Sequence, residues 1–215
     1  MPTKRPAPRR APARKEEERQ AKLQAILDAA LDVFLEKGFT EARLEDVAAR
    51  AGVGKGTIYL YVPSKQALLE TLIRSEIGGP IGTIEQRILS LDAPAEAKLR
   101  ALFSFLRKEI LGTRRVDIVR LILIEAGRFP ELAEIYHREV VATGMRLLRG
   151  IAEQGIATGE FQSDALVRFP QLAVAPGVLA LLWTAFFQRL DPLDVEGMLD
   201  THLALMMQAL KGPSS

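Results

Sequence analysis

The sequence contains no cysteine and only two histidines among its 215 residues. Without cysteine the chain has no disulfides, no thiolate zinc sites and no thiol nucleophiles. His137 and His202 do not form a metal-spaced cluster, so we expect no metal site and no cofactor. The chain also lacks sustained alternation of apolar and polar residues, which argues against a β-sheet. The absence of cysteine fits a cytoplasmic location, which we expect.

The chain lacks the residue groupings that most enzymes require. The segment GVGKGT at residues 52–57 superficially resembles a phosphate-binding loop. It does not have the spacing of that motif, and no expected strand precedes it. Neither a nucleophile–base pair nor a metal cluster is evident, so we expect no catalytic residues and no enzyme.

Acidic side chains are missing from the first part of the chain. Residues 1–15 hold six of the 29 basic side chains and no acidic one. Residues 16–215 hold the other 23 basic side chains and all 27 acidic ones. Residues 1–15 also hold four prolines and show no periodicity, so we expect a disordered basic arm. Such arms often bind nucleic acid, and Arg9, Arg10 and Arg14 are the candidates for contacts along DNA. The alternative is a solvated tail that aids solubility.

Residues 169–188 carry no charge and are long enough to span a bilayer. Pro170, Pro176 and Gly177 weaken that interpretation, and the segment that follows is amphipathic rather than a loop. A helix buried on most sides, as in a dimer core, is favoured, so we expect no membrane contact. The first residues contain no apolar run of the kind found in a secretory signal.

Apolar residues recur with helical spacing along most of the chain. The first helix is expected from near Glu16 to Lys37, with Gly38 as its C-terminal cap. Shorter helices are expected at about residues 44–51 and 54–62, and another after Ser64, which is its N-cap. The later helices are expected at about residues 95–111, 116–127, 130–154, 164–189 and 195–211. The expected fold class is therefore all-α.

Residues 26–72 have the layout of a helix-turn-helix: two short helices joined by a turn that contains Gly52. The chain must reverse sharply at this turn, and glycine adopts a positive φ with little strain. Ala48 allows the two helices to approach closely, while Val53, Ile58 and Val62 can fill the inner face. The outward face of the second helix can then enter a DNA major groove.

This stretch resembles the DNA-binding domain of the TetR/AcrR family of bacterial regulators. The residues that carry the resemblance read VAARAGVGKGTIYLYV at 47–62, followed by PSKQAL at 63–68. The resemblance covers about 50 residues at high density, whereas the later part is similar to the family only in length and helical content. It implies a transcription regulator, by family default a repressor, released from its operator by a small-molecule inducer.

The resemblance also implies roles for individual residues. Lys55 and Gly56 match positions that face base edges, and Leu60 is a candidate for contact with a thymine methyl group. Thr57 and Tyr59 match positions that contact phosphates or bases. Tyr61 and Lys65 match positions that contact phosphates. Arg43 stands where many members have serine or threonine, so the helix cap is lost but an arginine can reach a phosphate. Val62 replaces a common phenylalanine and leaves a smaller inner plug.

The domain organisation follows from these features together with the resemblance. Residues 1–15 form the arm, residues 16–75 a three-helix helix-turn-helix head, and residues 76–215 an all-α bundle for ligand binding and dimerisation. The resemblance places the interface of a homodimer on the last two helices, which implies a palindromic operator. Candidate residues for an apolar inducer pocket are Phe103, Arg107, Ile110, Glu125, Phe129, Tyr136, His137, Trp183 and Phe187.

Overall fold

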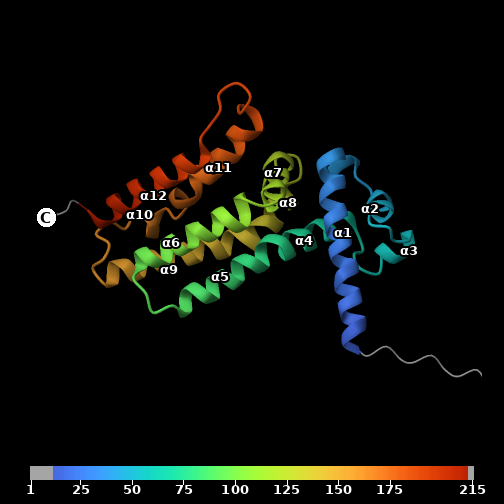
Figure 1. Cartoon of the computed structure of the whole chain (residues 1–215), viewed down its shortest axis with the longest axis horizontal. Helices are drawn as coiled ribbons and strands as arrows, with labels where there is room; N and C mark the ends of the chain where they lie inside the picture. The colour runs from blue at the N-terminus through green and yellow to red at the C-terminus, as the bar shows by residue number, and fades with distance from the viewer. Residues whose placement is uncertain (1–11, 213–215) are drawn as a thin grey trace, which may run out of the picture. The chain divides into compact units, whose positions relative to one another are not determined.

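The structure, a computed structural model, describes residues 12–212, and over that range it consists of helices and their connections without a strand (Figure 1). The expected all-α class is confirmed. The chain divides into two compact units that meet between Leu72 and Ile73, and each is considered by itself below. The glycines near residue 78 lie within the second unit.

The first unit holds the expected helix-turn-helix. Its helices are α1 (Pro12–Glu41), α2 (Leu44–Arg50), α3 (Lys55–Ile58) and most of α4 (Lys65–Ile73). Helix α1 begins at Pro12 rather than near Glu16, so Arg14 lies in its first turn, where it pairs with Glu18 at 3.6 Å. Arg9 and Arg10 of the basic arm lie outside the described residues.

A stripe of apolar side chains on α1 forms the core of this unit. Ile26, Leu27, Ala30, Leu31 and Phe34 are buried, as helical spacing predicts. Helical spacing also predicts Leu35, four residues after Leu31, in this stripe. That prediction is wrong, because Leu35 is exposed. Gly38 has a φ of 74° and interrupts the helical geometry of α1, as its expected role as a cap requires.

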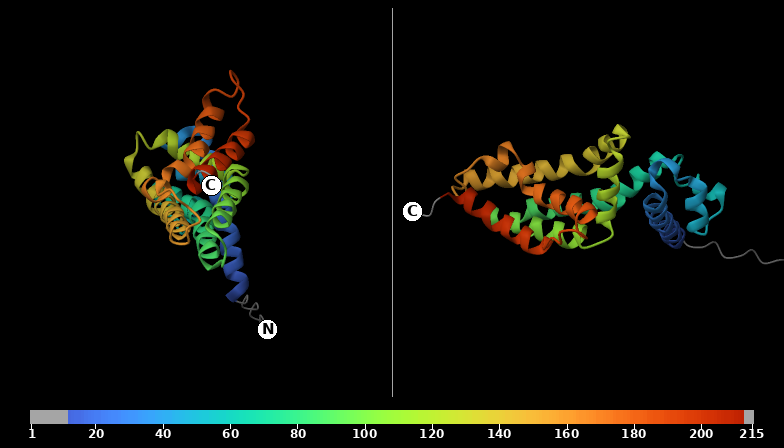
Figure 2. Two further views of the ribbon diagram at one scale, coloured as in Figure 1. Left: turned by 90° about the vertical axis from the view of Figure 1, so that its left-hand side faces the viewer. Right: turned by 90° about the horizontal axis from the view of Figure 1, so that it is seen from above.

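The second unit is a bundle of helices (Figure 2). Its elements are the π-helix η1 (Arg74–Gly78), α5 (Gly79–Ser90), α6 (Ala95–Phe105), the π-helix η2 (Leu106–Leu111), α7 (Arg115–Glu125), α8 (Pro130–Tyr136), the π-helix η3 (His137–Val141), α9 (Ala142–Ala157), α10 (Ala165–Arg168), α11 (Gln171–Phe186) and α12 (Val195–Lys211). The expected helices at 95–111, 116–127 and 195–211 are confirmed within a residue or two. The expected helix at 130–154 extends to Ala157 and contains a π-helical segment.

The glycines at 78 and 79 do not break the chain's helical path. Residues 65–90 are helical throughout, with η1 between α4 and α5. The backbone of Gly78 lies close to η3. A Cβ added at this position would be only 2.8 Å from the carbonyl oxygen of Glu139. The absence of a side chain at Gly78 is what permits this close approach.

The expected helix at 164–189 is two helices. Helix α10 ends at Arg168 and α11 begins at Gln171. Phe169 has a φ of −133° and a ψ of 67°, consistent with the exclusion of a residue before proline from helical geometry. In the described part of the chain, no helix combines the length and the apolar character needed to cross a membrane.

The core of the second unit joins six helices, α5, α6, α9, α10, α11 and α12. Its buried residues include Leu99, Leu148, Phe161, Ala173 and Met207. The Phe161 ring packs directly on Gly155, whose missing side chain leaves room for it. Glu160 accepts from the backbone N–H of Ala95 and Glu96 at 2.7 and 2.8 Å, which attaches the α9–α10 loop to the start of α6.

Candidate nucleic-acid interface

The turn between α2 and α3 has the tight geometry that the sequence predicts. Gly52 has a φ of 66°, in the left-handed region. The backbone N–H of Val53 donates to the carbonyl oxygen of Ala48 at 3.0 Å, which closes the turn after α2. Because the chain reverses within these few residues, α3 packs against α2 and presents its other face to solvent.

A set of small and branched residues fixes the inner face of α3. Ala48, Ile58 and Val62 are at most 2% exposed. Val62, in place of the phenylalanine common in the resembled family, is therefore still a buried plug. Val53 is only partly buried, so it contributes less to this contact than expected.

The outer face of the same segment carries exposed side chains of three different chemistries. Lys55 is a cation, Tyr59 is an aromatic donor at 46% exposure, and Leu60 is an apolar residue at 80% exposure. Gly56 is also exposed, whereas Thr57 and Tyr61 are half-buried. Base edges offer acceptors and thymine methyl groups to such a mixed surface.

Helix α3 is shorter than expected. It ends at Ile58, and residues 59–61 form a turn instead of continuing to Val62. The N–H of Leu60 donates to the carbonyl of Thr57 at 3.1 Å, and the N–H of Tyr61 donates to that of Ile58 at 3.0 Å. These bonds span three residues and tighten the last turn, as is common at helix ends.

One residue of this surface was not predicted as a site from sequence. Glu45 of α2 accepts from Lys55 Nζ at 2.9 Å and from the Tyr59 hydroxyl at 3.5 Å, both at its Oε1. The hydrogen bond from Lys55 lowers the pKa of Glu45, and the same bond raises the pKa of Lys55. From sequence, Glu45 is only an acid in the first turn of α2, where it complements the helix dipole.

Lys65 is half-buried, and its ammonium group is directed back to the end of α1. Its Nζ donates to the carbonyl oxygens of Phe39 and Thr40, the latter at 2.8 Å, and lies 4.7 Å from the centroid of the Phe39 ring. These contacts make Lys65 a structural link between α4 and α1. The expected phosphate contact would have to be made by the same ammonium group.

Arg43 precedes α2 with an exposed side chain and an extended backbone. The reciprocal half of a capping box is present, because Asp46 Oδ2 accepts from the backbone N–H of Arg43 at 3.3 Å. Asp46 also pairs with Lys37 at 2.9 Å, and this hydrogen bond lowers the pKa of the Asp46 carboxyl. The side chain of Arg43 thus lies at the surface beside the helix-turn-helix.

An ion pair also joins α1 to the end of α2. The guanidinium of Arg50 donates to both carboxylate oxygens of Glu36, at 2.6 and 2.7 Å. The planar fork of arginine matches a carboxylate in this way and restricts the orientation of both side chains. Hydrogen bonding to Arg50 lowers the pKa of Glu36.

The nine candidate residues of an inducer pocket differ in exposure and in the contacts that they make. Arg107 pairs with Asp200 at 2.7 Å, and the indole N–H of Trp183 donates to the carbonyl oxygen of Asp191 at 2.7 Å. Phe187 and His137 are exposed, whereas Ile110 and Glu125 are buried. Tyr136, Phe103 and Phe129 are partly buried. Several of these side chains therefore have structural contacts of their own.

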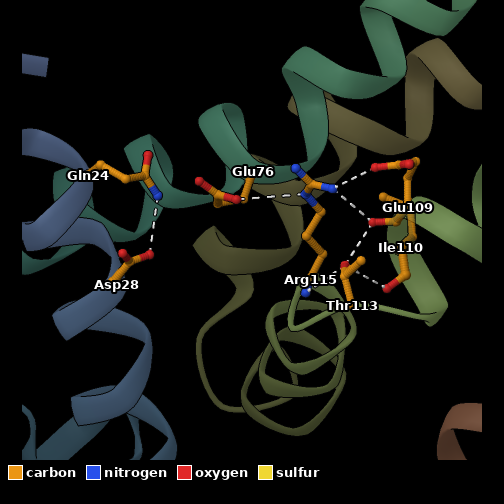
Figure 3. Close-up of polar contacts among 7 residues, drawn as sticks. All are labelled: Gln24, Asp28, Glu76, Glu109, Ile110, Thr113 and Arg115. Atoms are coloured by element: carbon orange, nitrogen blue, oxygen red, sulfur yellow. Dashed lines mark hydrogen bonds and ion pairs between the residues drawn. The ribbon is translucent and has the colours of Figure 1, made fainter. Parts of the chain in front are cut away.

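A hollow of about 430 Å³ is found elsewhere in the second unit, among η1, α5, α6, η2 and α7. It is lined by Ser75, Gly79, Pro80, Thr83, Ile84, Arg87, Phe105, Glu109 and Arg115, none of which is among the nine candidates. Figure 3 shows Arg115 between Glu76 and Glu109, with ion-pair distances of 3.7 and 3.1 Å. Two charged residues that line the hollow, Glu109 and Arg115, thus form an ion pair with each other.

The two C-terminal helices carry a large exposed apolar surface. The exposed residues on α11 and α12 and in the adjoining turns are Phe169, Leu172, Val178, Leu179, Leu182, Phe186, Phe187, Leu190 and Leu205. Several exposed apolar side chains on two helices that contact each other are typical of a protein interface. The resemblance implies a dimer interface on these two helices. There Leu172, Leu179, Leu182 and Phe186 are exposed in the single chain, whereas Met206 and Leu210, which were also expected at the interface, are buried in the core of the unit.

Comparison with known proteins agrees with this architecture. Residues 26–72 match the family described as bacterial regulatory proteins, tetR family. The chain is 29% identical over 136 residues to the fatty acid metabolism regulator protein of Bacillus subtilis, covering 63% of this chain and 69% of that protein. It is 27% identical over 135 residues to the HTH-type transcriptional repressor KstR2 of Mycolicibacterium smegmatis, covering 61% and 63%.

Solved structures show the same fold. The crystal structure of FadR from Bacillus subtilis in complex with stearoyl-CoA is similar with a TM-score of 0.65 at 24% identity, covering 87% of this chain and 98% of that one. The match at residues 26–72 includes the turn glycine, the buried plug and the exposed face of α3 described above. Residues 26–72 thus form a helix-turn-helix of the family of bacterial regulatory proteins, tetR family.

Proposed function

We propose that this regulator represses transcription by binding a palindromic operator as a homodimer, and that a small-molecule inducer releases it. The observation that supports DNA binding is the exposed outer face of α3 and the turn after it, which packs through fully buried residues on its inner face. Ile58 is 0% exposed and Leu60 is 80% exposed, although they are two residues apart. A surface that is rigidly supported yet open to solvent suits insertion into a major groove.

The proposed contacts follow from exposure and chemistry. Lys55 and Gly56 face base edges, Leu60 contacts a thymine methyl group, and Tyr59 and Thr57 contact bases or phosphates. Arg43 and Tyr61 contact the phosphate backbone, which positions the protein without reading sequence. Lys65 supports the site from α1, with any phosphate contact secondary to its hydrogen bonds to the carbonyl groups of Phe39 and Thr40.

We propose that two copies associate through α11 and α12. The exposed apolar residues of these helices support this choice, because association would remove them from water. Each copy would use the same surface in a two-fold dimer, and two heads related by that symmetry require an operator with two related half-sites. The palindromic operator thus follows from the dimer.

The inducer is proposed to bind within the second unit. The nine candidate residues stay proposals, and the hollow beside Arg115 is a second location to test. A relative from Bacillus subtilis regulates fatty acid metabolism by name, and a FadR structure from that organism contains stearoyl-CoA. Long-chain acyl-CoA thioesters are therefore the first ligands to try. A ligand releases DNA only if it binds the DNA-free conformation more tightly than the DNA-bound one.

The test is selection of bound sequences from a random duplex pool. The wild-type chain is compared with a variant that truncates the exposed face, Tyr59→Ala/Leu60→Ala. A matched control truncates Leu35, an exposed leucine of α1. We expect the wild type and Leu35→Ala to enrich one palindrome and the face variant to enrich none. Failure of the folded wild type to enrich any sequence, at low salt and without ligand, would refute the proposal.

Release is tested separately on the selected operator. Acyl-CoA thioesters of increasing chain length are added to the complex, with free coenzyme A as the control. Loss of operator binding with the thioester but not with free coenzyme A would support induction by that class. Unchanged affinity with all of them would remove the class from consideration and leave DNA binding intact.

A further inference from the structure

Two residues of the exposed face converge on one carboxylate. Lys55 Nζ lies 2.9 Å from Glu45 Oε1, and the Tyr59 hydroxyl donates to the same oxygen at 3.5 Å. Lys55 and Tyr59 come from α3 and its last turn, while Glu45 comes from α2. An acid therefore contacts two residues of a surface proposed to approach a polyanion.

The carboxylate balances the charge of this surface. Lys55 is the only basic residue of α3, and its side chain is 70% exposed. With Glu45 beside it, the pair has no net charge. The directions of the two pKa shifts, downward for Glu45 and upward for Lys55, favour the ionised form of both partners at neutral pH.

We propose that Glu45 is a specificity-determining residue of the DNA interface, which directs Lys55 and Tyr59 to base edges and disfavours their use on phosphates. The inference rests on the proposed DNA-binding function. A phosphate placed on Lys55 also approaches Glu45, and the two negative charges repel. Phosphate contacts are the source of non-specific affinity, so this repulsion acts mainly on binding to the wrong sequence.

A base contact is compatible with the Glu45–Lys55 pair. An ammonium group has three N–H donors, and the contact with Glu45 occupies one of them. Two donors remain for the adjacent N7 and O6 acceptors of guanine in the major groove. These acceptors carry only partial charge, so the carboxylate repels them far less than a phosphate. Glu45 thereby restrains a flexible lysine in an orientation suited to reading a base.

The experiment replaces Glu45 by its neutral isostere. Glu45→Gln and wild type are titrated with the selected operator and with a scrambled duplex over a series of salt concentrations. We expect Glu45→Gln to bind the scrambled duplex about fivefold more tightly, with little gain on the operator, so the specificity ratio falls. The slope of log K against log salt on the scrambled duplex should steepen by about 0.9, the value for one more phosphate contact.

Glu36→Gln is the matched control. Glu36 is also an exposed glutamate paired with a cation, Arg50, but it lies on α1. The variant has the same change in net charge, so general electrostatics alone would give both variants equal slopes. Thermal unfolding of both variants verifies that each head is folded.

A second comparison tests whether Glu45 acts through Lys55. In a Lys55→Gln background, adding Glu45→Gln should leave the salt slope unchanged, because no lysine is released to a phosphate. An unchanged slope and specificity ratio in Glu45→Gln, while the wild type selects its palindrome normally, would overturn this inference alone. A wild type that selects no duplex would overturn the proposed function together with the inference.

Discussion

Lys65 Nζ donates a hydrogen bond to the carbonyl oxygen of Thr40 at 2.8 Å. This contact joins the start of α4 to the last residues of α1, and it engages a carbonyl group at a helix end that has no intrahelical partner. A residue that the family resemblance assigns to phosphate thus has a structural function in the free protein. Loss of DNA binding in a Lys65 variant can therefore arise from either function.

Replacing Lys65 by methionine separates these functions. Lys65→Met keeps most of the apolar stem but removes the hydrogen bonds to the carbonyl groups, so we expect the free energy of unfolding to fall by about 1–3 kcal/mol. Urea denaturation provides the measurement, and Lys22→Met, at an exposed lysine of α1, is the control. Equal stability of Lys65→Met and wild type would show that the link to α1 contributes nothing.

Gly52 has a positive φ of 66°, and a Cβ at this position would contact nothing within 4 Å. Gly52→Ala therefore tests backbone strain without a steric clash, and we expect a loss of about 1–2 kcal/mol in stability. Gly56→Ala is the matched control, because Gly56 is helical and its Cβ would also lie in open space. Gly56→Ala should be neutral or slightly stabilising. A stable Gly52→Ala would contradict the strained turn.

Leu205 of α12 and Leu89 of α5 are both 60% exposed. If α12 lies in the dimer interface, Leu205→Arg places a charge in an apolar contact and should weaken dimerisation by at least about tenfold. Leu89→Arg makes the same substitution outside that surface and should leave the dimer intact. Sedimentation velocity over a concentration series measures both. Dissociation caused by Leu89→Arg instead would move the interface to α5.

Burial raises the pKa of the Tyr136 phenol from 10.0 to about 12. Between these pH values the unfolded chain gives up this proton more readily than the folded one. The stabilisation is therefore complete below pH 10 and is lost as pH rises toward 12. Tyr136→Phe removes the titrating group and should reduce the alkaline loss of stability by about 2 kcal/mol. Urea unfolding near neutral pH and at alkaline pH tests this, and parallel curves for both proteins would contradict it.

The contribution of the basic arm to DNA binding is tested by removing its positive charges. Replacing Lys4, Arg5, Arg9 and Arg10 by glutamine in the full chain keeps its length. If these side chains bind phosphates, the salt dependence of operator binding should flatten by about 0.9 for each phosphate that the variant no longer neutralises. The replacement of Arg19 and Lys22 on α1 by glutamine provides a comparison. An unchanged slope would favour the alternative of a tail that only aids solubility.

Features that depend on neighbouring residues were predictable from the sequence. The buried stripe of α1 follows from 3.6-residue spacing, the turn at Gly52 from the backbone freedom of glycine, and the start of α4 from Ser64, whose hydroxyl accepts from Ala67 N at 3.1 Å. The motif at residues 47–68 likewise predicted the position of the candidate interface. Its side chains project from short elements whose local geometry is strongly constrained.

Only the tertiary structure determined which distant side chains meet. Lys55 is ten residues from Glu45, and Lys65 lies 25 residues from Thr40, separations over which helical periodicity carries no information. Long, flexible lysine side chains select their partners by distance in space, after packing of the inner faces has positioned the helices. The sequence alone thus determined the helices and the surface proposed to bind DNA. Packing between helices decided that Glu45 lies beside Lys55 and that the Lys65 side chain is directed toward α1.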